Sequence, residues 1–322
     1  MKNILITGGA GYIGSKVSYD LIDAGYKIII IDNLSSGKKK LIPQKAIFEK
    51  IDITNFKTLE KLFKKYKFNS VFHFAAKKKV DESQKYPLKY FKTNVIGTKN
   101  LLDLIVKYKT KNFIFSSSCS VYGNALSYKV TEKNFLLPSN YYGYTKLISE
   151  NTIAEYKKKY NFNYAILRYF NVIGADHKLR TGEINIGSLF KNIVFSIKRK
   201  KVFQIFGDNY NTKDGTCIRD YIDINDLSKL HILAMRKIMK LKKSILFNCG
   251  YSKPISVYDI IKNFEKILKC KIKFKIKDRR SGDVEKIFSN NNIQKRLFPQ
   301  WKQKYDLSNS IISTLKWEKI KL

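Results

Sequence analysis

The sequence is poor in several residue types, and each scarcity limits what the protein can be. It has four cysteines in 322 residues, Cys119, Cys217, Cys249 and Cys270, and no two of them form a C-x-x-C pair. Its three histidines are equally scattered, so neither a zinc-ligand spacing nor a disulfide framework can be recognised. We therefore expect no metal, and we expect a protein of the reducing cytoplasm.

Long hydrophobic runs are also missing. The apolar start of the chain, residues 4–6, leads directly into Gly8 and Gly9 and is too short for the core of a signal peptide. No run of about 18 apolar residues occurs, so we expect no membrane span and no membrane partner. Hydrophobic residues still make up 44% of the chain, which is enough to form a sizeable buried core.

Arginine is scarce, although the formal net charge is +37. Only eight of the 63 basic residues are arginine, and the lysines are spread over the whole chain among many Ile, Asn, Tyr and Phe residues. A basic surface attracts nucleic acid, but arginine is the residue that makes bidentate contacts with bases and phosphates. The pattern indicates biased amino-acid usage, so we expect no nucleic-acid partner beyond nonspecific attraction to polyanions.

Short apolar runs alternate with helix-like stretches in the first half of the chain. The expected helices cover residues 14–24, 54–66, 87–108 and 142–160, and the expected buried strands cover 3–7, 27–32, 46–52, 70–76, 112–118 and 163–170. Continuous apolar strands alternating with helices predict a parallel sheet covered on both faces. The fold class is therefore α/β, a Rossmann-type doubly wound parallel sheet with a smaller mixed α/β domain.

A glycine-rich turn follows the first expected strand. Gly8, Gly11 and Gly14 in TGGAGYIG (7–14) lie between that strand and the first helix. They allow a tight turn, a close approach of a pyrophosphate, and close packing of the helix on the strand. Asp32 lies 18 residues after Gly14 at the end of the second strand, where a carboxylate binds ribose hydroxyls and disfavours a 2′-phosphate. The pattern predicts a site for NAD.

Two nearby polar residues are less informative. Asp52, at the end of the third strand, can reach an adenine amino group or can be a solvated aspartate. His73 lies inside the fourth strand, where a core histidine with satisfied hydrogen bonds is more common than a catalyst.

The rhythm of the sequence changes after Asn171. Loops lengthen at residues 175–187 and 207–215, and two helix–strand passages follow near 223–240 and 256–269. We expect residues 1–171 to form the NAD-binding Rossmann domain and residues 172–322 a substrate domain, with segments near 220–230 returning to pack on the first domain.

Tyr142 and Lys146 form a Y-x-x-x-K pattern at the start of an expected helix. Their spacing places phenol and ammonium on one helix face. A free tyrosine has a pKa of about 10, and a nearby ammonium and a positive nicotinamide ring would lower it. Ser118 ends the fifth strand at the edge where ligands bind, so it can relay a proton from a substrate hydroxyl to Tyr142. A surface helix and a turn-forming serine are the alternative interpretation.

Several segments resemble the extended short-chain dehydrogenase/reductase family, and within it the epimerases of nucleotide sugars. The resemblance covers nearly the whole chain, and its segments are TGGAGYIGS (7–15), IDNL (31–34), HFAA (73–76), FSSSCSVYG (115–123), YGYTK (142–146), LRYFNVIGA (167–175), DGTCIRDYI (214–222) and RRSGD (279–283). It implies an isomerase with tightly bound NAD that interconverts UDP-glucose and UDP-galactose. The sugar would be oxidised transiently at C4, rotate as a ketose, and be reduced on its other face.

The resemblance also implies roles for residues. Ser118, Tyr142 and Lys146 would be the catalytic group. The cofactor site would comprise Gly8, Gly11, Tyr12, Ile13, Gly14, Asp32, Asn33, Asp52, Ile53, Phe74, Ala75, Ala76, Lys78, Ser118, Tyr142, Lys146 and Phe170. The UDP-sugar would contact Ser118, Tyr142, Asn171, Phe206, Arg219, Arg280 and Asp283. Within that set, two arginines would clamp the diphosphate, Phe206 would lie by the uracil and Asp283 would hold the uridine ribose.

The sequence departs from the family pattern at a few positions. These are Cys119, where alanine is usual, Tyr141, where proline is common, Thr93, where some relatives have an NAD-contacting asparagine, and Gly187-Ser188, where Asn-Leu or His-Leu is frequent. Ile287 is intermediate in size between the bulky tyrosine and the small residues that distinguish relatives by sugar size. Use of UDP-N-acetylglucosamine or UDP-glucuronate is therefore an open alternative.

Two other functions are weighed against this expectation. Related dehydratases carry Thr-Asp-Glu where this chain has Ser117-Ser118-Cys119, and the missing carboxylate argues against a dehydratase. A catalytically silent NAD-binding regulator is a remote alternative, because the catalytic group is intact. Relatives are commonly homodimers through helices that correspond to residues 87–108 and 142–160, so the resemblance implies a homodimer.

Overall fold

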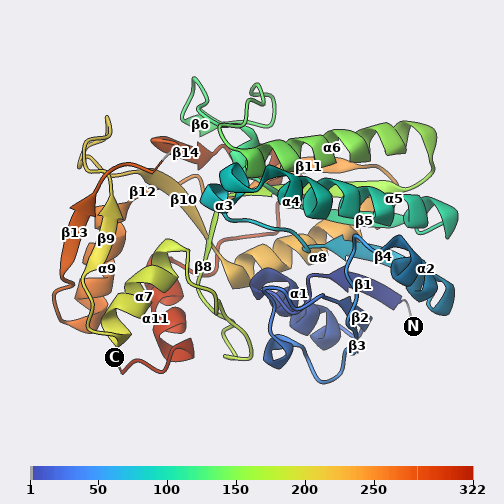
Figure 1. The fold of residues 1–322 in the computed structure, drawn as a ribbon, viewed down its shortest axis with the longest axis horizontal. Helices are drawn as coiled ribbons and strands as arrows, with labels where there is room; N and C mark the ends of the chain where they lie inside the picture. Colours follow the sequence, from blue (N-terminus) through green and yellow to red (C-terminus); the bar gives the residue numbers. More distant parts are fainter. Residues whose placement is uncertain (1–2, 281, 322) are drawn as a thin grey trace. The chain divides into compact units, whose positions relative to one another are not determined.

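The computed structural model describes residues 3–280 and 282–321, and these fold as two compact units (Figure 1). Unit 1 comprises Met1–Val121, Asn140–Arg168 and Ser228–Phe247. Unit 2 comprises Tyr122–Ser139, Tyr169–Leu227 and Asn248–Leu322.

The single boundary expected at residue 171 is therefore too simple. A returning segment was expected, and Ser228–Phe247 belongs to unit 1, but Tyr122–Ser139 belongs to unit 2. The physical reason is pairing: strand β6 (Lys129–Val130) lies parallel to strand β14 (Lys286–Ser289), which is also in unit 2.

Unit 1 is built on a seven-stranded sheet with the order β11-β7-β5-β4-β1-β2-β3. Its strands are β1 (Asn3–Thr7), β2 (Lys27–Ile31), β3 (Ile47–Glu49), β4 (Phe68–His73), β5 (Asn112–Ser118), β7 (Asn163–Tyr169) and β11 (Ile245–Cys249). β1 pairs in parallel with β2 on one side and with β4 on the other. The strand order thus reverses beside β1, which is where open α/β sheets bind ligands. The expected Rossmann-type sheet is confirmed. β11 follows the helix of the helix–strand passage expected near 223–240, but it joins this sheet and not one in the second unit.

Both faces of this sheet are covered, as the alternation of side chains requires. Leu5, Ile29 and Ile31 belong to a core cluster that also takes in residues of α2 (Phe56–Lys65), α5 (Gly97–Lys107) and α6 (Tyr141–Lys159). Figure 1 shows α5 and α6 running side by side, in agreement with their contacts. The alternate residues Ile4 and Ile28 are equally buried. Helices α1 (Tyr12–Asp23) and α8 (Ile224–Leu241) are joined by a 2.6 Å hydrogen bond from Ser228 to Asp20.

The long helix expected at 87–108 is interrupted. It consists of α4 (Pro87–Tyr90), a π-helical segment (Phe91–Ile96) and α5, and it is preceded by the short helix α3 (Val80–Lys85). π-Helical turns are rare in proteins, and those that occur often lie at functional sites. Short 3₁₀ turns occur at Lys39–Leu41 and Cys119–Val121.

Unit 2 contains a sheet with the order β12-β10-β14-β6, and β8 (Asn171–Ile173) also pairs with β10 (Ile218–Asp223). β12 (Pro254–Ser256) is antiparallel to β10. A separate parallel pair joins β9 (Phe203–Phe206) and β13 (Phe274–Lys277). The helices are α7 (Leu189–Lys198), α9 (Val257–Leu268), α10 (Asn292–Leu297) and α11 (Leu307–Trp317).

The core of unit 2 forms between β10 and these helices. Phe190 of α7, Tyr221 of β10, Phe264 of α9 and Ile311 of α11 belong to one buried cluster. Helix α9 begins where the Ser256 hydroxyl accepts a hydrogen bond from Asp259 N while the Asp259 carboxylate accepts one from Ser256 N. Within the part of the chain that the structure describes, no helix is both long and apolar enough to cross a membrane.

Candidate active site

The glycine turn closes tightly on its neighbours. Gly8 has a φ of +71°, and a Cβ on it would lie 2.6 Å from the amide nitrogen of Ala75. A Cβ on Gly14 would lie 2.3 Å from the carbonyl oxygen of Gly8. Gly11 precedes the first residue of α1 and directs the free amides of the helix start toward the turn. This arrangement can accept an anionic pyrophosphate.

Asp32 follows β2 and is nearly buried. Its carboxylate accepts hydrogen bonds from the backbone amides of Ala10 at 3.1 Å and Leu34 at 2.8 Å. Burial raises the pKa of Asp32, and these two amides partly offset the effect. A carboxylate has about four acceptor positions, so Asp32 keeps the capacity to accept ribose hydroxyls.

Asn33 and Asp52, which come from different loops, are brought together. The Asn33 amide donates to Asp52 at 2.8 Å, and the backbone and side chain of Thr54 donate to the same carboxylate at 2.8 Å. Burial raises the pKa of Asp52, but the bonds from Thr54 and Asn33 outweigh it, so the pKa is lowered overall. The carboxylate is therefore anchored rather than freely solvated. The neighbouring Ile53 is buried against Gly97.

Phe74, Ala75 and Ala76 lie beyond the end of β4, although the sequence placed them inside a strand. The chain leaves the sheet after His73, and Thr7 holds it there, accepting a bond from Phe74 N at 3.0 Å and one from Ala75 N at 3.2 Å. This segment therefore borders the glycine turn. The structure brings Phe74, Ala75 and Ala76 to the expected place, with Lys78 exposed further along the loop.

His73 is a core residue. Its two ring nitrogens lie 2.7 Å from the Thr7 hydroxyl and 2.9 Å from the Thr98 hydroxyl. Burial, together with the charge of Lys146, lowers the pKa of His73 to about 3, so the ring is neutral. The interpretation of His73 as a satisfied core histidine is confirmed.

Ser118, Tyr142 and Lys146 meet where β5 ends and α6 begins. Helix α6 begins because the Asn140 side chain accepts a hydrogen bond from Gly143 N at 2.9 Å. Tyr142 hydrogen-bonds with Ser118. Lys146 is buried, donates to the carbonyl oxygen of Ser116 at 2.7 Å, and lies 6.0 Å from the centre of the Tyr142 ring. The grouping expected from the sequence is therefore present in unit 1.

The electrostatics of this group differ from the expectation. Lys146 was expected to lower the pKa of Tyr142, but burial raises that pKa to about 12, against the bond with Ser118 that lowers it. Burial also lowers the pKa of Lys146 to about 8, against the raising effect of Glu150. Desolvation dominates because the Lys146 ammonium is bound to a carbonyl and stands at some distance from the phenol. In the chain alone, the phenol of Tyr142 therefore keeps its proton near neutral pH.

Asn94 received no role from the sequence, but its side chain lies between two segments of the candidate site. It lies in the π-helical segment, where its side chain bonds Lys77 N at 2.9 Å, Lys77 O at 3.0 Å and the Thr145 hydroxyl at 2.9 Å. It therefore ties the loop after β4 to the catalytic helix. Thr93, the neighbouring residue, occupies the position where some relatives have an NAD-contacting asparagine.

Unit 2 contains the residues that the family resemblance assigns to the nucleotide, and several of them contact one another or neighbouring strands. The Arg280 guanidinium stacks 3.7 Å from the centre of the Phe206 ring, and Asp283 N bonds Arg280 O at 3.3 Å. Arg219 of β10 donates to Ile218 O at 2.9 Å and to Glu285 O at 3.2 Å.

Two further residues named from the sequence also lie in unit 2. Asn171 is paired with Tyr221 of β10. Phe170 is buried directly after β7.

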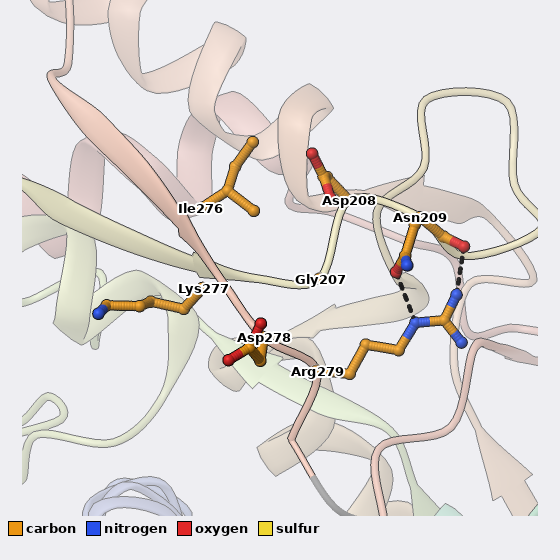
Figure 2. A pocket seen from close by; sticks show the side chains of 7 residues that line it. All are labelled: Gly207, Asp208, Asn209, Ile276, Lys277, Asp278 and Arg279. Atoms are coloured by element: carbon orange, nitrogen blue, oxygen red, sulfur yellow. Dashed lines mark hydrogen bonds between the residues drawn. The ribbon is translucent and has the colours of Figure 1, made fainter.

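A hollow of about 370 Å³ lies beside Phe206 and Arg280 along the chain, lined by Gly207, Asp208, Asn209, Ile276, Lys277, Asp278 and Arg279. Figure 2 shows Arg279 reaching across to Asn209. Its Nε donates to Asn209 Oδ1 at 2.7 Å, its Nη2 donates to Asn209 O, and its guanidinium lies 4.1 Å from the centre of the Tyr210 ring. Arg279 received no role from the sequence, although it adjoins Arg280.

Fold and site together define a class of protein. A glycine turn from β1 to α1, a carboxylate after β2, and a serine, tyrosine and lysine at the end of β5 and the start of α6 are the parts of a Rossmann-type enzyme that uses a dinucleotide.

The chain belongs to the NAD dependent epimerase/dehydratase family, whose model matches residues 4–250. It is 37% identical over 320 residues to a UDP-glucose 4-epimerase of Lactobacillus helveticus, covering 98% of this chain and 97% of that protein. Among solved structures it is similar to a UDP-glucose 4-epimerase of Bifidobacterium longum in complex with NAD⁺ and UDP, with a TM-score of 0.92 and 30% identity, covering 99% and 98% of the two chains. It is also similar to a UDP-Glc/GlcNAc 4-epimerase of Campylobacter jejuni, with a TM-score of 0.85 and 36% identity over 99% of each chain.

Proposed function

We propose that the protein is an NAD-dependent epimerase that interconverts UDP-glucose and UDP-galactose by inverting the C4 centre of the sugar. The observation that carries this proposal is the meeting of Ser118, Tyr142 and Lys146 in a buried place at the carboxyl edge of the sheet. It is supported by near full-length similarity to UDP-glucose 4-epimerases at about the same chain length.

The residues of unit 1 fit NAD. A Cβ on Gly8 or Gly14 would clash with backbone atoms, so glycine is needed for the tight turn of a pyrophosphate site, and Asp32 offers a carboxylate that favours hydroxyls over a phosphate. When bound, NAD supplies an acceptor and donor of hydride, so that C4 can be oxidised and reduced with no net redox change. We expect the cofactor to stay bound through many turnovers for the same reason.

The chain's own residues handle the proton and the anchoring. Tyr142, through the Ser118 hydroxyl, takes the proton of the C4 hydroxyl and later returns it to the C4 oxygen. Lys146 is held by the carbonyl oxygen of Ser116 on the same helix face as Tyr142 and can hold ribose hydroxyls. Arg219 and Arg280 hold the diphosphate of the substrate, because guanidinium groups bind phosphate oxygens bidentately. An anchored diphosphate leaves the sugar free to rotate before it is reduced.

The test uses purified protein without added cofactor. It is mixed with UDP-galactose, UDP-glucose is followed with a coupled dehydrogenase, and NAD is measured after denaturation. We expect conversion with co-purified NAD, and a loss of roughly 10²–10⁴-fold in kcat for Tyr142→Phe with NAD retained. Well-folded wild-type protein with neither bound NAD nor conversion would refute the proposal.

N-acetylated UDP-sugars are a second candidate substrate class. The supporting observations are the similarity to the UDP-Glc/GlcNAc 4-epimerase of Campylobacter jejuni and the position of Ile287, which is buried in β14 and paired with Arg219. The same assay with UDP-N-acetylglucosamine, and with UDP-glucuronate, decides among the substrates. If the protein binds NAD and converts only UDP-N-acetylglucosamine or only UDP-glucuronate, that UDP-sugar is the substrate.

We also propose a homodimer in the cytoplasm. Tyr86, Leu88, Ile96, Tyr144 and Ile148 expose large apolar side chains on the region from α3 to α6, and Leu88 is 79% exposed. These side chains lie on segments that contact one another, and exposed apolar side chains on neighbouring helices are typical of an interface. Sedimentation equilibrium tests the dimer, and a monomer at micromolar concentration would refute it. The cytoplasm is supported by four cysteines without a disulfide among them.

A further inference from the structure

A buried carboxylate stands one helical turn beyond the catalytic lysine. Glu150 lies on α6 four residues after Lys146, and only 4% of its surface is exposed. It receives three hydrogen bonds from Arg168 of β7: Nε donates at 3.0 Å and 3.2 Å to the two oxygens, and Nη2 donates at 2.5 Å. The arginine is buried to the same degree. A buried ion pair need not stabilise the fold, because removing both charges from water costs about as much as their attraction contributes. The position of Glu150 therefore needs a functional explanation.

The same carboxylate also holds β5. The Ser117 hydroxyl donates to Glu150 Oε1. Ser117 stands between Ser116, whose carbonyl binds Lys146, and Ser118, which bonds with Tyr142. Glu150 therefore connects the end of β5, the catalytic helix and β7 at one point.

The charges around Lys146 give this carboxylate a second role. The titratable groups that interact with Lys146 are Tyr142 and Glu150 on its own helix and His73 on β4. Around these groups, Cys119 after β5 interacts with Tyr142, and Arg168 of β7 is paired with Glu150. Tyr142 is protonated and His73 is neutral near pH 7. The Glu150 carboxylate raises the pKa of Lys146, against the larger lowering by burial.

We propose that Glu150 is a positioning residue of the catalytic group, which fixes the end of β5 through Ser117 and places a negative charge one helical turn from Lys146. Arg168 balances the carboxylate and holds it in place on β7. The inference rests on the proposed epimerase function.

The experiment compares Glu150→Gln with Glu155→Gln. The second variant makes the same change on the same helix, at an exposed residue paired with the exposed Lys158 at 2.7 Å. Conversion of UDP-galactose is measured from about pH 6 to about pH 10, the range in which Lys146 titrates. For Glu150→Gln we expect at least ~10-fold lower kcat, a nearly unchanged KM, and an alkaline limb moved about one pH unit lower.

The direction follows from the sign of the charge. Removing a carboxylate makes the ammonium less stable, so Lys146 loses its proton at a lower pH. Glu155→Gln should leave both kcat and the limb as in the wild type. Ser117→Ala keeps the charge and removes only the bond, so it should lower kcat without moving the limb.

A further variant guards against misfolding. Glu150→Gln combined with Arg168→Met removes both buried charges, so its unfolding temperature should lie above that of Glu150→Gln, while the limb still moves toward lower pH. An unmoved limb in both Glu150 variants, or an equal change in Glu155→Gln, would overturn the inference.

The outcome is separable from the proposed function. If the wild type converts no UDP-sugar, the proposed epimerase function is wrong. The role of Glu150 is then tested by measuring the unfolding temperature as a function of pH. The pKa of Lys146 is about 8 in the folded protein and about 10.4 when unfolded, so its contribution to stability rises between these values. Glu150→Gln should begin that rise at a lower pH and Glu155→Gln should not; identical curves would overturn the inference.

Discussion

A single methyl group at Gly14 should separate cofactor binding from folding. Gly14→Ala places a Cβ 2.3 Å from Gly8 O, 2.9 Å from Gly8 C and 3.0 Å from Gly9 Cα. All three are backbone atoms, so the turn itself has to move rather than a flexible side chain. Overpacking of this kind costs about 1–3 kcal/mol.

The strain caused by Gly14→Ala lies in the turn that we expect to hold the pyrophosphate of NAD. Because 1.4 kcal/mol corresponds to a tenfold loss of affinity, a strain of this size in the turn should weaken NAD binding by roughly 5–150-fold. The assay is the amount of NAD released from purified protein on denaturation, together with the unfolding temperature with and without added NAD.

Gly25→Ala is the matched control, at the other end of α1. Gly25 has a φ of +85° but has no atom within 4 Å of a Cβ position. This variant should lose about 1–2 kcal/mol of stability through its left-handed backbone and should keep its NAD. Gly14→Ala that retains a full complement of NAD, or Gly25→Ala that loses it equally, would refute the reasoning from the turn.

Three further outcomes follow from the same geometry. Asp32→Ala removes the acceptor of two backbone amides and of the ribose hydroxyls, so retained NAD should fall and discrimination against NADP should weaken, as measured by titration of the two cofactors into the stripped protein. Arg280→Ala removes a charged partner of the diphosphate, worth about 1.5–3 kcal/mol, and should raise KM for UDP-galactose by roughly 10–150-fold with little change in kcat; an unchanged KM would place the diphosphate elsewhere. Burial raises the pKa of Asp223 to about 6, above an unfolded value of about 3.9, so its contribution to stability is greatest at low pH and is lost as the pH rises from about 4 to about 6. Urea unfolding of Asp223→Asn should therefore show a smaller fall over this window than the wild type, and parallel curves would contradict the assignment.

The parts of unit 1 that the sequence predicted are those in which a local pattern and the final environment agree. All seven residues of β5 are buried, and the run NFIFSSS reads as a covered strand that ends in hydroxyls. Gly8 and Gly14 are required by contacts with backbone, so glycine marks them directly. The end of β5 and the glycine turn were therefore placed correctly without any knowledge of the tertiary structure.

The parts that escaped prediction depend on distant partners. The π-helical segment is stabilised by Asn94 bonding Lys77 and Thr145, which lie 17 and 51 residues away. Helix α6 buries the polar residues Lys146, Ser149 and Glu150. In the sequence, polar residues on a helix face indicate exposure to solvent, so the burial of this face was not predicted. Arg168 lies in the mostly apolar strand β7 and is buried. A buried arginine requires a charged partner, so its presence in that strand indicates a buried carboxylate nearby.

Unit 2 was less predictable for a related reason. Strands β9 and β13 pair in parallel across about seventy residues, and both β13 and one face of β9 are exposed, so no hydrophobic pattern fixes their register. Tyr122–Ser139 joined unit 2 through a two-residue strand, too short to leave a sequence signal. The family resemblance named Arg280 and Phe206, but it did not predict the stacking that joins them.

The most informative disagreement between expectation and structure concerns Tyr142. The chain by itself holds this phenol protonated near pH 7, because burial outweighs the bond with Ser118 and Lys146 is engaged with Ser116. A positive ring beside it would favour the phenolate, and a neutral ring would restore the phenol. Tyr142 would then take a proton in the oxidising half of the reaction and give it back in the reducing half, without any change in the surrounding protein. The burial that makes Tyr142 a poor base in isolation is thus what makes its proton affinity follow the charge of the cofactor.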